Sequence, residues 1–141
     1  MNIIVTGGAG FIGTNLCKEL IKLGHKVTSI DNYSTGKEQN HIEGIRYENF
    51  DIRKVYDYKW VYNKHPDVIF HLAAIARIQP SFNKPKEYFT TNANGTLEIT
   101  DYCAKNNVPL IIGGDFNVIP TDDDVYSPQN FKNDACTHPR T

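Results

Sequence analysis

Five short, mostly apolar runs recur along residues 1–112, each bounded by glycine, proline or polar residues. The first run, Ile3-Ile4-Val5 within Asn2 to Thr6, has no alternation between apolar and polar positions. A near-continuous apolar run is typical of a parallel strand that is covered on both faces. The pattern therefore predicts buried parallel strands over residues 2–6, 26–30, 45–50, 67–72 and 108–112.

Segments with helical spacing separate these runs. Apolar residues form one stripe over residues 11–23, and Gly24 follows where a C-terminal cap is expected. Amphipathic patterns also predict helices over 54–64 and 85–106, whereas the polar residues 32–44 are predicted to be a loop. Strands that alternate with helices imply right-handed crossovers. The predicted fold is α/β, a Rossmann-like doubly wound parallel sheet of about five strands in the order 3-2-1-4-5 with an irregular C-terminal tail.

The turn after the first predicted strand carries glycines at a G-x-x-G-x-x-G spacing. Gly7 allows a sharp turn, Gly10 leaves room for a pyrophosphate at the helix N-terminus, and Gly13 allows the helix to pack closely. An ordinary strand-to-helix turn is the alternative. An acidic residue, Asp31, follows at close to the ~20 residues that the dinucleotide-binding fingerprint requires. The stretch therefore predicts dinucleotide binding.

Asp31 directly follows the second predicted strand. Its carboxylate can accept hydrogen bonds from both hydroxyls of an adenosine ribose, and it would repel a 2′-phosphate. A turn-forming aspartate is the alternative. We therefore predict NAD rather than NADP as the cofactor.

Composition and charge narrow the function classes. The 141 residues suit one domain, and the 40% hydrophobic and 22% charged fractions are those of a soluble globular protein. A net charge of −1 makes nucleic acid an unexpected partner. Cys17, Cys103 and Cys136 are odd in number and widely spaced, which argues against a disulfide framework or a zinc site. Without an apparent membrane span or signal peptide, the protein is expected to be cytoplasmic.

Six motifs occur in a fixed order along the chain. They are Thr6 to Gly13, Asp31 to Gly36, Asp51 to Arg53, His71 to Ala74, Ser81 with Pro85 and Tyr88, and Asn92 to Thr96. With these motifs, residues 1 to about 111 resemble the N-terminal part of the extended short-chain dehydrogenase/reductase family. The likeness is to its NAD-dependent nucleotide-sugar epimerases and dehydratases, above all the UDP-glucose 4-epimerase type.

The resemblance implies NAD as the cofactor and a nucleotide sugar as the substrate. It also implies a binding role for each matching position. The implied contacts are Gly7, Gly10, Phe11 and Ile12 for the pyrophosphate, with Gly13 completing the turn; Asp31 and Asn32 for the adenosine ribose; Asp51 and Ile52 for the adenine; Leu72, Ala73 and Ala74 for the middle of the cofactor; and Asn92 for its nicotinamide side.

The resemblance implies reversible hydride transfer between a sugar C4 and NAD, with a tyrosine and a lysine four residues on as catalytic pair. This sequence departs from the family because the serine-rich segment after the fifth strand, a downstream Tyr-x-x-x-Lys and the sugar-binding region are missing. Tyr33 with Lys37 matches the spacing, but Gly36 interrupts it and the loop gives no helical proximity. The chain is expected to be truncated, to hold the cofactor and not to turn over a sugar.

The tail carries a second likeness. Its Gly114-Asp115-Phe116-Asn117 stretch resembles a segment of the endonuclease/exonuclease/phosphatase superfamily, in its bacterial exodeoxyribonuclease branch. That resemblance implies that Asp115 activates water and that Asn117 contacts the scissile phosphate. The other metal-binding and catalytic residues of that family are missing here, so no metal site is expected. Residues 113–141 carry five acidic and two basic side chains, a net charge of −3 that repels a phosphate backbone.

We therefore expect a chimera of two parts. Residues 1–112 are predicted to form an NAD-binding Rossmann domain, and residues 113–141 a nuclease-like tail that is not an independent domain. Three functions stay open: the NAD-binding part of a nucleotide-sugar epimerase or dehydratase, a metal-dependent nuclease or phosphatase, and a non-enzymatic cofactor-binding fragment. The family resemblance also implies a possible homodimer through helices that include residues 85–106.

Overall fold

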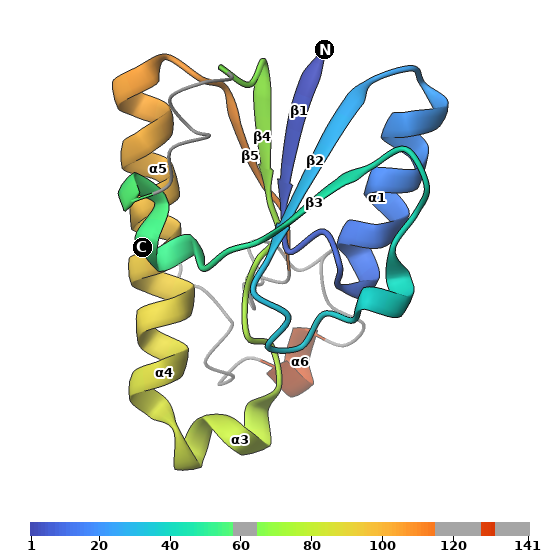
Figure 1. The fold of residues 1–141 in the computed structure, drawn as a ribbon. Helices are drawn as coiled ribbons and strands as arrows, with labels where there is room; N and C mark the ends of the chain where they lie inside the picture. The colour runs from blue at the N-terminus through green and yellow to red at the C-terminus, as the bar shows by residue number, and fades with distance from the viewer. Residues whose placement is uncertain (58–64, 115–127, 132–141) are drawn as a thin grey trace.

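The computed structural model describes residues 1–57, 65–114 and 128–131 and shows a layered α/β arrangement (Figure 1). The strands are β1 (Asn2–Thr6), β2 (Lys26–Asp31), β3 (Arg46–Asn49), β4 (Val68–His71) and β5 (Leu110–Ile112). The α-helices are α1 (Phe11–Lys22), α3 (Ile78–Asn83), α4 (Pro85–Phe89), α5 (Gly95–Asn106) and α6 (Pro128–Phe131). The shorter helical elements are the 3₁₀ segments η1 (Glu38–Asn40) and η2 (Ile52–Asp57) and the π-helical turn η3 (Thr90–Asn94).

The five strands form one parallel sheet in the order β3-β2-β1-β4-β5. β1 is central, and Thr6 at its carboxyl end pairs with Ile30 of β2 on one side and His71 of β4 on the other. The predicted fold class and strand order, a Rossmann-like doubly wound sheet, are confirmed. Because the strands are parallel, their carboxyl ends lie together at the lower edge of the sheet in Figure 1.

The two faces of the sheet have separate apolar cores, because successive side chains of a strand point to opposite faces. α1 lies against one face and α5 against the other (Figure 1). The core beside α1 contains Ile3, Val5, Cys17, Leu20, Val27 and Val68. The core beside α5 contains Ile4, Ile30, Ile52, Ile69, Ile99, Tyr102, Cys103 and Val108.

Cys17 and Cys103 belong to these cores as free thiols. Burial raises the pKa of the Cys17 thiol to about 12 and that of the Cys103 thiol to about 11. Both side chains are therefore protonated at neutral pH and act as small apolar groups. Cys136 lies outside the described residues.

The helical segments differ from the prediction, first because η1 (Glu38–Asn40) and α6 (Pro128–Phe131) lie in stretches predicted as irregular. The helix predicted over 54–64 is wrong at its start, since Ile52–Asp57 is a 3₁₀ segment, and residues 58–64 lie outside the described residues. The predicted helix over 85–106 is helical throughout, but the π-helical turn η3 separates α4 from α5. The short helix α3 has no counterpart in the predicted pattern.

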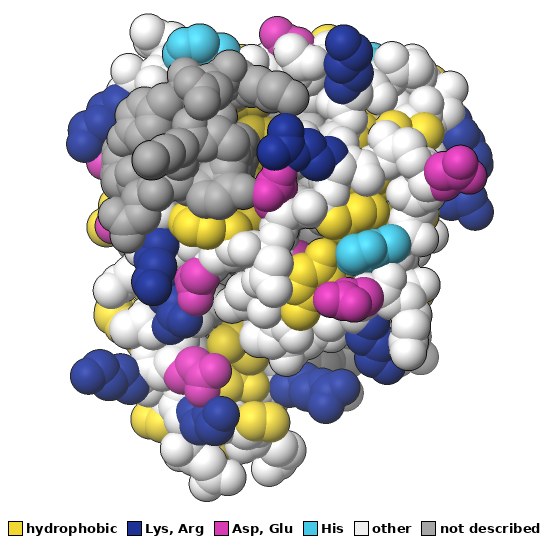
Figure 2. All heavy atoms as spheres, in the orientation of Figure 1, with side chains coloured by type: hydrophobic (Ala, Val, Ile, Leu, Met, Phe, Trp, Pro, Cys, Tyr) yellow, Lys and Arg dark blue, Asp and Glu magenta, His cyan; other side chains and the backbone are white. Residues whose placement is uncertain are grey.

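The surface mixes charges of both signs. Figure 2 shows basic and acidic side chains interspersed on one face of the molecule. Exposed ion pairs such as Lys22 with Glu19 (2.6 Å) contribute little to stability, because water screens them. Within the described residues, no helix combines the length and the apolar character that a membrane span requires.

Candidate functional site

Two adjoining cavities open at the carboxyl edge of the sheet. In a doubly wound sheet, ligands bind at this edge, beside the point where the connections diverge on either side of the central strand. The smaller cavity, of about 70 Å³, is lined by residues that follow β1, β2, β3 and β4. The larger, of about 700 Å³, is lined from α1, the segment after β4, α5 and the end of β5. The loop 72–75 lines both cavities, so it is the wall that they share.

The structure gathers most of the predicted cofactor residues around these cavities. Those that line the smaller cavity are Gly7, Gly10, Asp31, Asn32, Ile52, Leu72, Ala73 and Ala74. Ile12 and Asn92 line the larger cavity, together with Leu72, Ala73 and Ala74. Phe11, Gly13 and Asp51 line neither of the two.

In the glycine turn after β1, backbone atoms leave no room for a side chain at Gly7 or at Gly13. Gly7 has a φ of +72°, and a Cβ there would lie 2.8 Å from the backbone nitrogen of Ala73. A Cβ at Gly13 would lie 2.2 Å from the carbonyl oxygen of Gly7. Real Cβ atoms essentially never approach this closely, so both glycines are required by backbone packing. Gly13 therefore brings α1 against the turn itself, a structural role.

The start of α1 is available to an anion. Its N-cap is Gly10, which provides no side-chain hydrogen bond, and the first turn of the helix holds no acidic residue. The first N–H groups of a helix have no partner inside the helix, and the helix dipole adds a partial positive charge there. Phe11 and Ile12, 85% and 59% exposed, leave this end open to solvent.

Asp31 is buried, with 8% of its surface exposed, and ties the glycine turn to the loop after β2. Its Oδ2 accepts the N–H of Ala9 at 3.1 Å, and its Oδ1 accepts the N–H of Tyr33 at 2.9 Å. A carboxylate has about four acceptor positions, so each oxygen can still accept a further hydrogen bond. Because Asp31 lines the smaller cavity, those positions are available to hydroxyl donors of a ligand.

Asn32 and Asp51 use their side chains partly for local structure. The Oδ1 of Asn32 accepts the N–H of Ser34 at 3.0 Å. The guanidinium of Arg53 donates to both oxygens of Asp51, at 2.9 Å and 2.5 Å. These hydrogen bonds hold the pKa of the Asp51 carboxyl below its usual range, although partial burial opposes the shift. Asp51 is thus engaged by Arg53, and its neighbour Ile52 provides the contact with the cavity.

The loop 72–75 is held by side chains from two distant segments. The N–H groups of Leu72 and Ala73 both donate to Thr6 Oγ1 at 3.3 Å. Asn92 holds Ile75 at two points, because its Oδ1 accepts the Ile75 N–H at 2.8 Å and its Nδ2 donates to the Ile75 carbonyl at 3.0 Å. The amide of Asn92 therefore shapes the cavity wall.

The structure gives contacts to three motif residues for which the family resemblance implies no binding role. Thr6 and His71 are buried at 0% and 3% exposure, and Thr6 Oγ1 lies 2.6 Å from His71 Nδ1. His71 Nε2 lies 2.9 Å from Thr96 Oγ1. Burial lowers the pKa of His71 to about 4, so the ring is neutral at neutral pH. In the sequence, Thr6 and His71 each end an apolar run and begin a family motif, but neither pattern indicates that the two side chains meet.

Two further pairs of residues were considered as catalytic candidates in the sequence, Tyr33 with Lys37 and Asp115 with Asn117. Tyr33 and Lys37 lie on the loop after β2, as predicted, and the Tyr33 hydroxyl is 2.9 Å from His41 Nε2. Asp115 and Asn117, the nuclease candidates, lie outside the described residues. In the part of the chain that the structure describes, no three His, Cys, Asp or Glu side chains gather in a way that could hold a metal ion.

Comparison with known proteins gives a consistent group of relatives. The chain matches the NAD dependent epimerase/dehydratase family over residues 3–137. It is 39% identical over 111 residues to the UDP-N-acetyl-alpha-D-glucosaminuronate decarboxylase of Bacillus cytotoxicus, covering 77% of this chain and 34% of the relative. It is 32% identical over 134 residues to UDP-glucuronic acid decarboxylase 1 of Danio rerio, and the match covers 91% of this chain and 32% of the relative.

Solved structures agree. The UDP-glucose 4-epimerase of Thermotoga maritima with UDP-glucose matches with a TM-score of 0.75 at 34% identity, covering 79% of this chain and 37% of that one. The UDP-glucose 4-epimerase of Thermus thermophilus in complex with NAD matches with a TM-score of 0.75 at 30% identity. That match covers 86% of this chain and 41% of the epimerase.

These comparisons also bear on the tail and on length. The family match continues to residue 137, and the nuclease resemblance predicted for residues 113–141 finds no support in them. The chain spans about a third of the length of the curated relatives that it matches. From the parallel sheet, the glycine turn and the match over residues 3–137, the chain belongs to the NAD-dependent epimerase/dehydratase family.

Proposed function

We propose that residues 1–112 form an NAD-binding Rossmann domain, the cofactor-binding part of a nucleotide-sugar epimerase or dehydratase. One observation carries most weight: the glycine turn, the uncapped start of α1 and the buried Asp31 meet around the smaller cavity. A pyrophosphate requires backbone donors and no intervening side chain, and a ribose requires paired acceptors. Both requirements are met within one site.

The residues present suggest an orientation for the cofactor. Its pyrophosphate would lie at Gly10 and the N–H groups that begin α1, and its adenosine ribose at Asp31 and Asn32. The adenine would lie beside Ile52, and the nicotinamide half would pass the loop 72–75 into the larger cavity, where Asn92 holds the wall. NAD bound there supplies a hydride acceptor.

Asp31 favours NAD over NADP in this arrangement. An adenosine 2′-phosphate would have to lie beside its carboxylate, where like charges repel at close range and burial weakens screening. The nucleotide-sugar substrate follows from the relatives, which are named for UDP-sugars. We do not assign turnover to this stretch of chain, because its single Tyr-x-x-x-Lys, Tyr33 with Lys37, lies on the loop after β2.

Thermal unfolding with and without cofactor tests the proposal. A ligand at ~100 times its dissociation constant adds about 2.7 kcal/mol, which raises the midpoint of a domain of this size by several degrees. We expect that rise with NAD, a smaller one with NADP, and its loss in Asp31→Ala. Because this variant also removes the acceptors of Ala9 and Tyr33, each variant is compared with its own cofactor-free midpoint.

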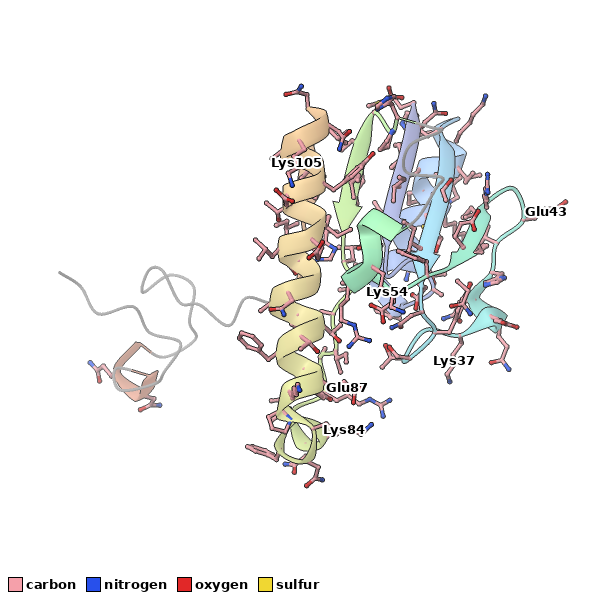
Figure 3. The ribbon with its side chains drawn as sticks, turned by 60° about the vertical axis from the view of Figure 1, so that its left-hand side comes forward. Lys37, Glu43, Lys54, Lys84, Glu87 and Lys105 are labelled. Atoms are coloured by element: carbon pink, nitrogen blue, oxygen red, sulfur yellow. The ribbon has the colours of Figure 1, made fainter. Side chains whose placement is uncertain are left out.

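Glu43→Ala is the matched control. Glu43 is an exposed carboxylate on the loop before β3 and points outward, away from the sheet (Figure 3). This variant should keep the full NAD-induced rise. A cooperative transition that neither cofactor moves in the unmodified protein would overturn the proposal.

We also propose that the family's pairing through helices extends to this chain. α4 and α5 expose Phe89 and Leu97, each at 65%, and apolar side chains at such levels favour an apolar partner surface. Sedimentation equilibrium should show a dimer that Leu97→Glu dissociates. A monomer at high protein concentration would rule out the pairing.

A further inference from the structure

His71 connects three elements that are far apart in the sequence. It is the last residue of β4, and its ring nitrogens contact Thr6 of β1 at 2.6 Å and Thr96 of α5 at 2.9 Å. The three side chains therefore form one continuous polar path between the sheet and α5. It runs beside the loop 72–75, which lines both cavities.

The hydrogen-bond partners determine which nitrogen of His71 carries the proton. The Thr96 hydroxyl has a single proton and donates it to the carbonyl oxygen of Asn92 at 2.7 Å. Toward His71 the Thr96 oxygen must therefore accept, so Nε2 of His71 is protonated. A neutral imidazole then has an unprotonated Nδ1, which accepts the hydroxyl proton of Thr6.

The same count of hydrogen-bond donors and acceptors argues against a charged imidazolium at His71. Thr6 Oγ1 already accepts the N–H of Ala73 at 3.3 Å and, at the same distance, that of Leu72, which also donates to the Thr6 carbonyl oxygen at 3.1 Å. A proton on Nδ1 of His71 would direct a third donor at this oxygen and leave the Thr6 hydroxyl proton without an acceptor. Burial also lowers the pKa of His71, which likewise favours the neutral ring.

The path continues to both ends of the loop. At the first end, Thr6 holds Leu72 and Ala73. At the other end, Thr96 accepts from His71 and donates to Asn92, whose side chain holds both backbone groups of Ile75. Asn92 lies in the π-helical turn η3, a helix irregularity that occurs frequently at functional sites.

We propose that His71, as the neutral Nε2–H tautomer, is a positioning residue that keeps the loop 72–75 in the shape that binds the cofactor. It does so through Thr6 at one end of the loop and through Thr96 and Asn92 at the other. This role rests on the proposed NAD site, since the loop matters to function only if the cofactor passes it.

The tautomer is tested first, without cofactor. Two-bond ¹⁵N–¹H correlation spectra of protein with labelled histidines distinguish the Nε2–H, Nδ1–H and charged rings. We expect the Nε2–H form for His71 at pH 7, and still at about pH 5.5, where an imidazole of ordinary pKa would be mostly charged. An Nδ1–H tautomer, or a charged ring at pH 7, would overturn the proposal.

The positioning role is tested with three variants on one helix. Thr96→Val removes the acceptor for His71 and the donor to Asn92, whereas Thr96→Ser keeps both. Thr100→Val is the matched control, because Thr100 makes the equivalent hydroxyl-to-carbonyl bond, 2.8 Å to Thr96, one turn further along α5. The dissociation constant for NAD should rise about tenfold in Thr96→Val and stay near the unmodified value in the other two. Equal effects of Thr96→Val and Thr100→Val would contradict the role.

A second measurement distinguishes failure of the proposed NAD binding from failure of the proposed positioning role. If the unmodified protein does not bind NAD, amide exchange of Ile75 measures the loop directly, since this N–H is bonded to Asn92. Faster exchange in Thr96→Val than in Thr100→Val would still support positioning by this path. Unchanged exchange would overturn it, whatever the result with NAD.

Discussion

The two halves of the candidate site are built in different ways. Around β1, α1 and β2 the site consists mainly of backbone, where Gly7 and Gly13 leave no space for a Cβ and N–H groups converge on Asp31. Around β4, η3 and α5 it consists of side chains that hold a loop. Those side chains are His71, Asn92 and Thr96, joined by Thr6 from the end of β1.

The difference predicts different weaknesses. A backbone turn in close contact with its neighbours tolerates no added atom, because the interior is already close-packed. A chain of hydrogen-bonded side chains tolerates small changes of volume but depends on which group carries each proton. The glycine half should therefore fail through steric clash, and the side-chain half through protonation.

Gly13→Ala should have the largest effect. The new Cβ would lie 2.2 Å from the Gly7 carbonyl oxygen, a backbone atom that cannot move without disrupting the turn. We expect a loss of about 3 kcal/mol or more in the free energy of unfolding, measured by urea titration. Gly10→Ala, whose nearest contact would be 3.2 Å, should cost only about 1 kcal/mol. Equal losses in the two variants would contradict the steric explanation.

Acidification should destabilise the folded protein through His71, which lies in the side-chain half of the site. The pKa of His71 is about 4 in the folded protein against an ordinary value of 6.5. As the pH falls, the unfolded chain therefore takes up the proton first, and this favours unfolding. The free energy of unfolding should decrease by about 3 kcal/mol between about pH 6.5 and pH 4, as measured by urea titration across this window.

His71→Gln separates this effect from other titrations. The variant should be less stable at pH 7 and should lack this part of the pH dependence. His65→Asn, at an exposed histidine, should retain it. If His71→Gln does not fold, the pKa of His71 in the unmodified protein can be measured by NMR. A value near 6.5 would contradict the prediction.

Ser29→Ala should have the smallest effect, in the stabilising direction. The hydroxyl of Ser29 is buried without a hydrogen-bond partner in the described structure, beside Gly8, where a Cβ would lie 2.2 Å from it. Removing an unpaired buried polar group should add about 1 kcal/mol to the free energy of unfolding. Thr28→Ala, at the half-buried neighbour on β2, should give no such gain. A destabilised Ser29→Ala protein would show that the hydroxyl has a partner.

The strand order was predictable because it depends on local signals and one handedness rule. Each apolar run marks a buried strand, and right-handed crossovers leave few orders for five parallel strands. The observed order β3-β2-β1-β4-β5 confirms this. Two helical details were not predictable. The 3₁₀ segment Ile52–Asp57 begins with hydrogen bonds from Arg53 and Lys54 to Asp51, and the π-helical turn at Thr90–Asn94 falls inside an otherwise regular helical pattern.

The candidate site likewise contains residues whose role was predictable from the sequence and residues whose role was not. Gly7, Gly10 and Asp31 were predictable because a glycine spacing and an acidic residue about 20 positions later form a motif within one β-α-β unit. The engagement of Asp51 by Arg53 and the use of Asn92 to hold Ile75 were not predictable from residue type. In both cases the hydrogen-bond partner of the side chain determines which of its donors and acceptors remain available to a ligand.

By itself, the sequence determined the parallel sheet, the glycine turn and the acidic residue that accompanies it. These depend on patterns within about thirty residues, a range in which backbone geometry follows from residue type. Only the tertiary structure decided the path through Thr6, His71 and Thr96, because His71 is 65 residues from the first and 25 from the second. Buried polar groups must find partners wherever the fold brings them, so the tautomer of His71 depends on contacts that no local pattern contains.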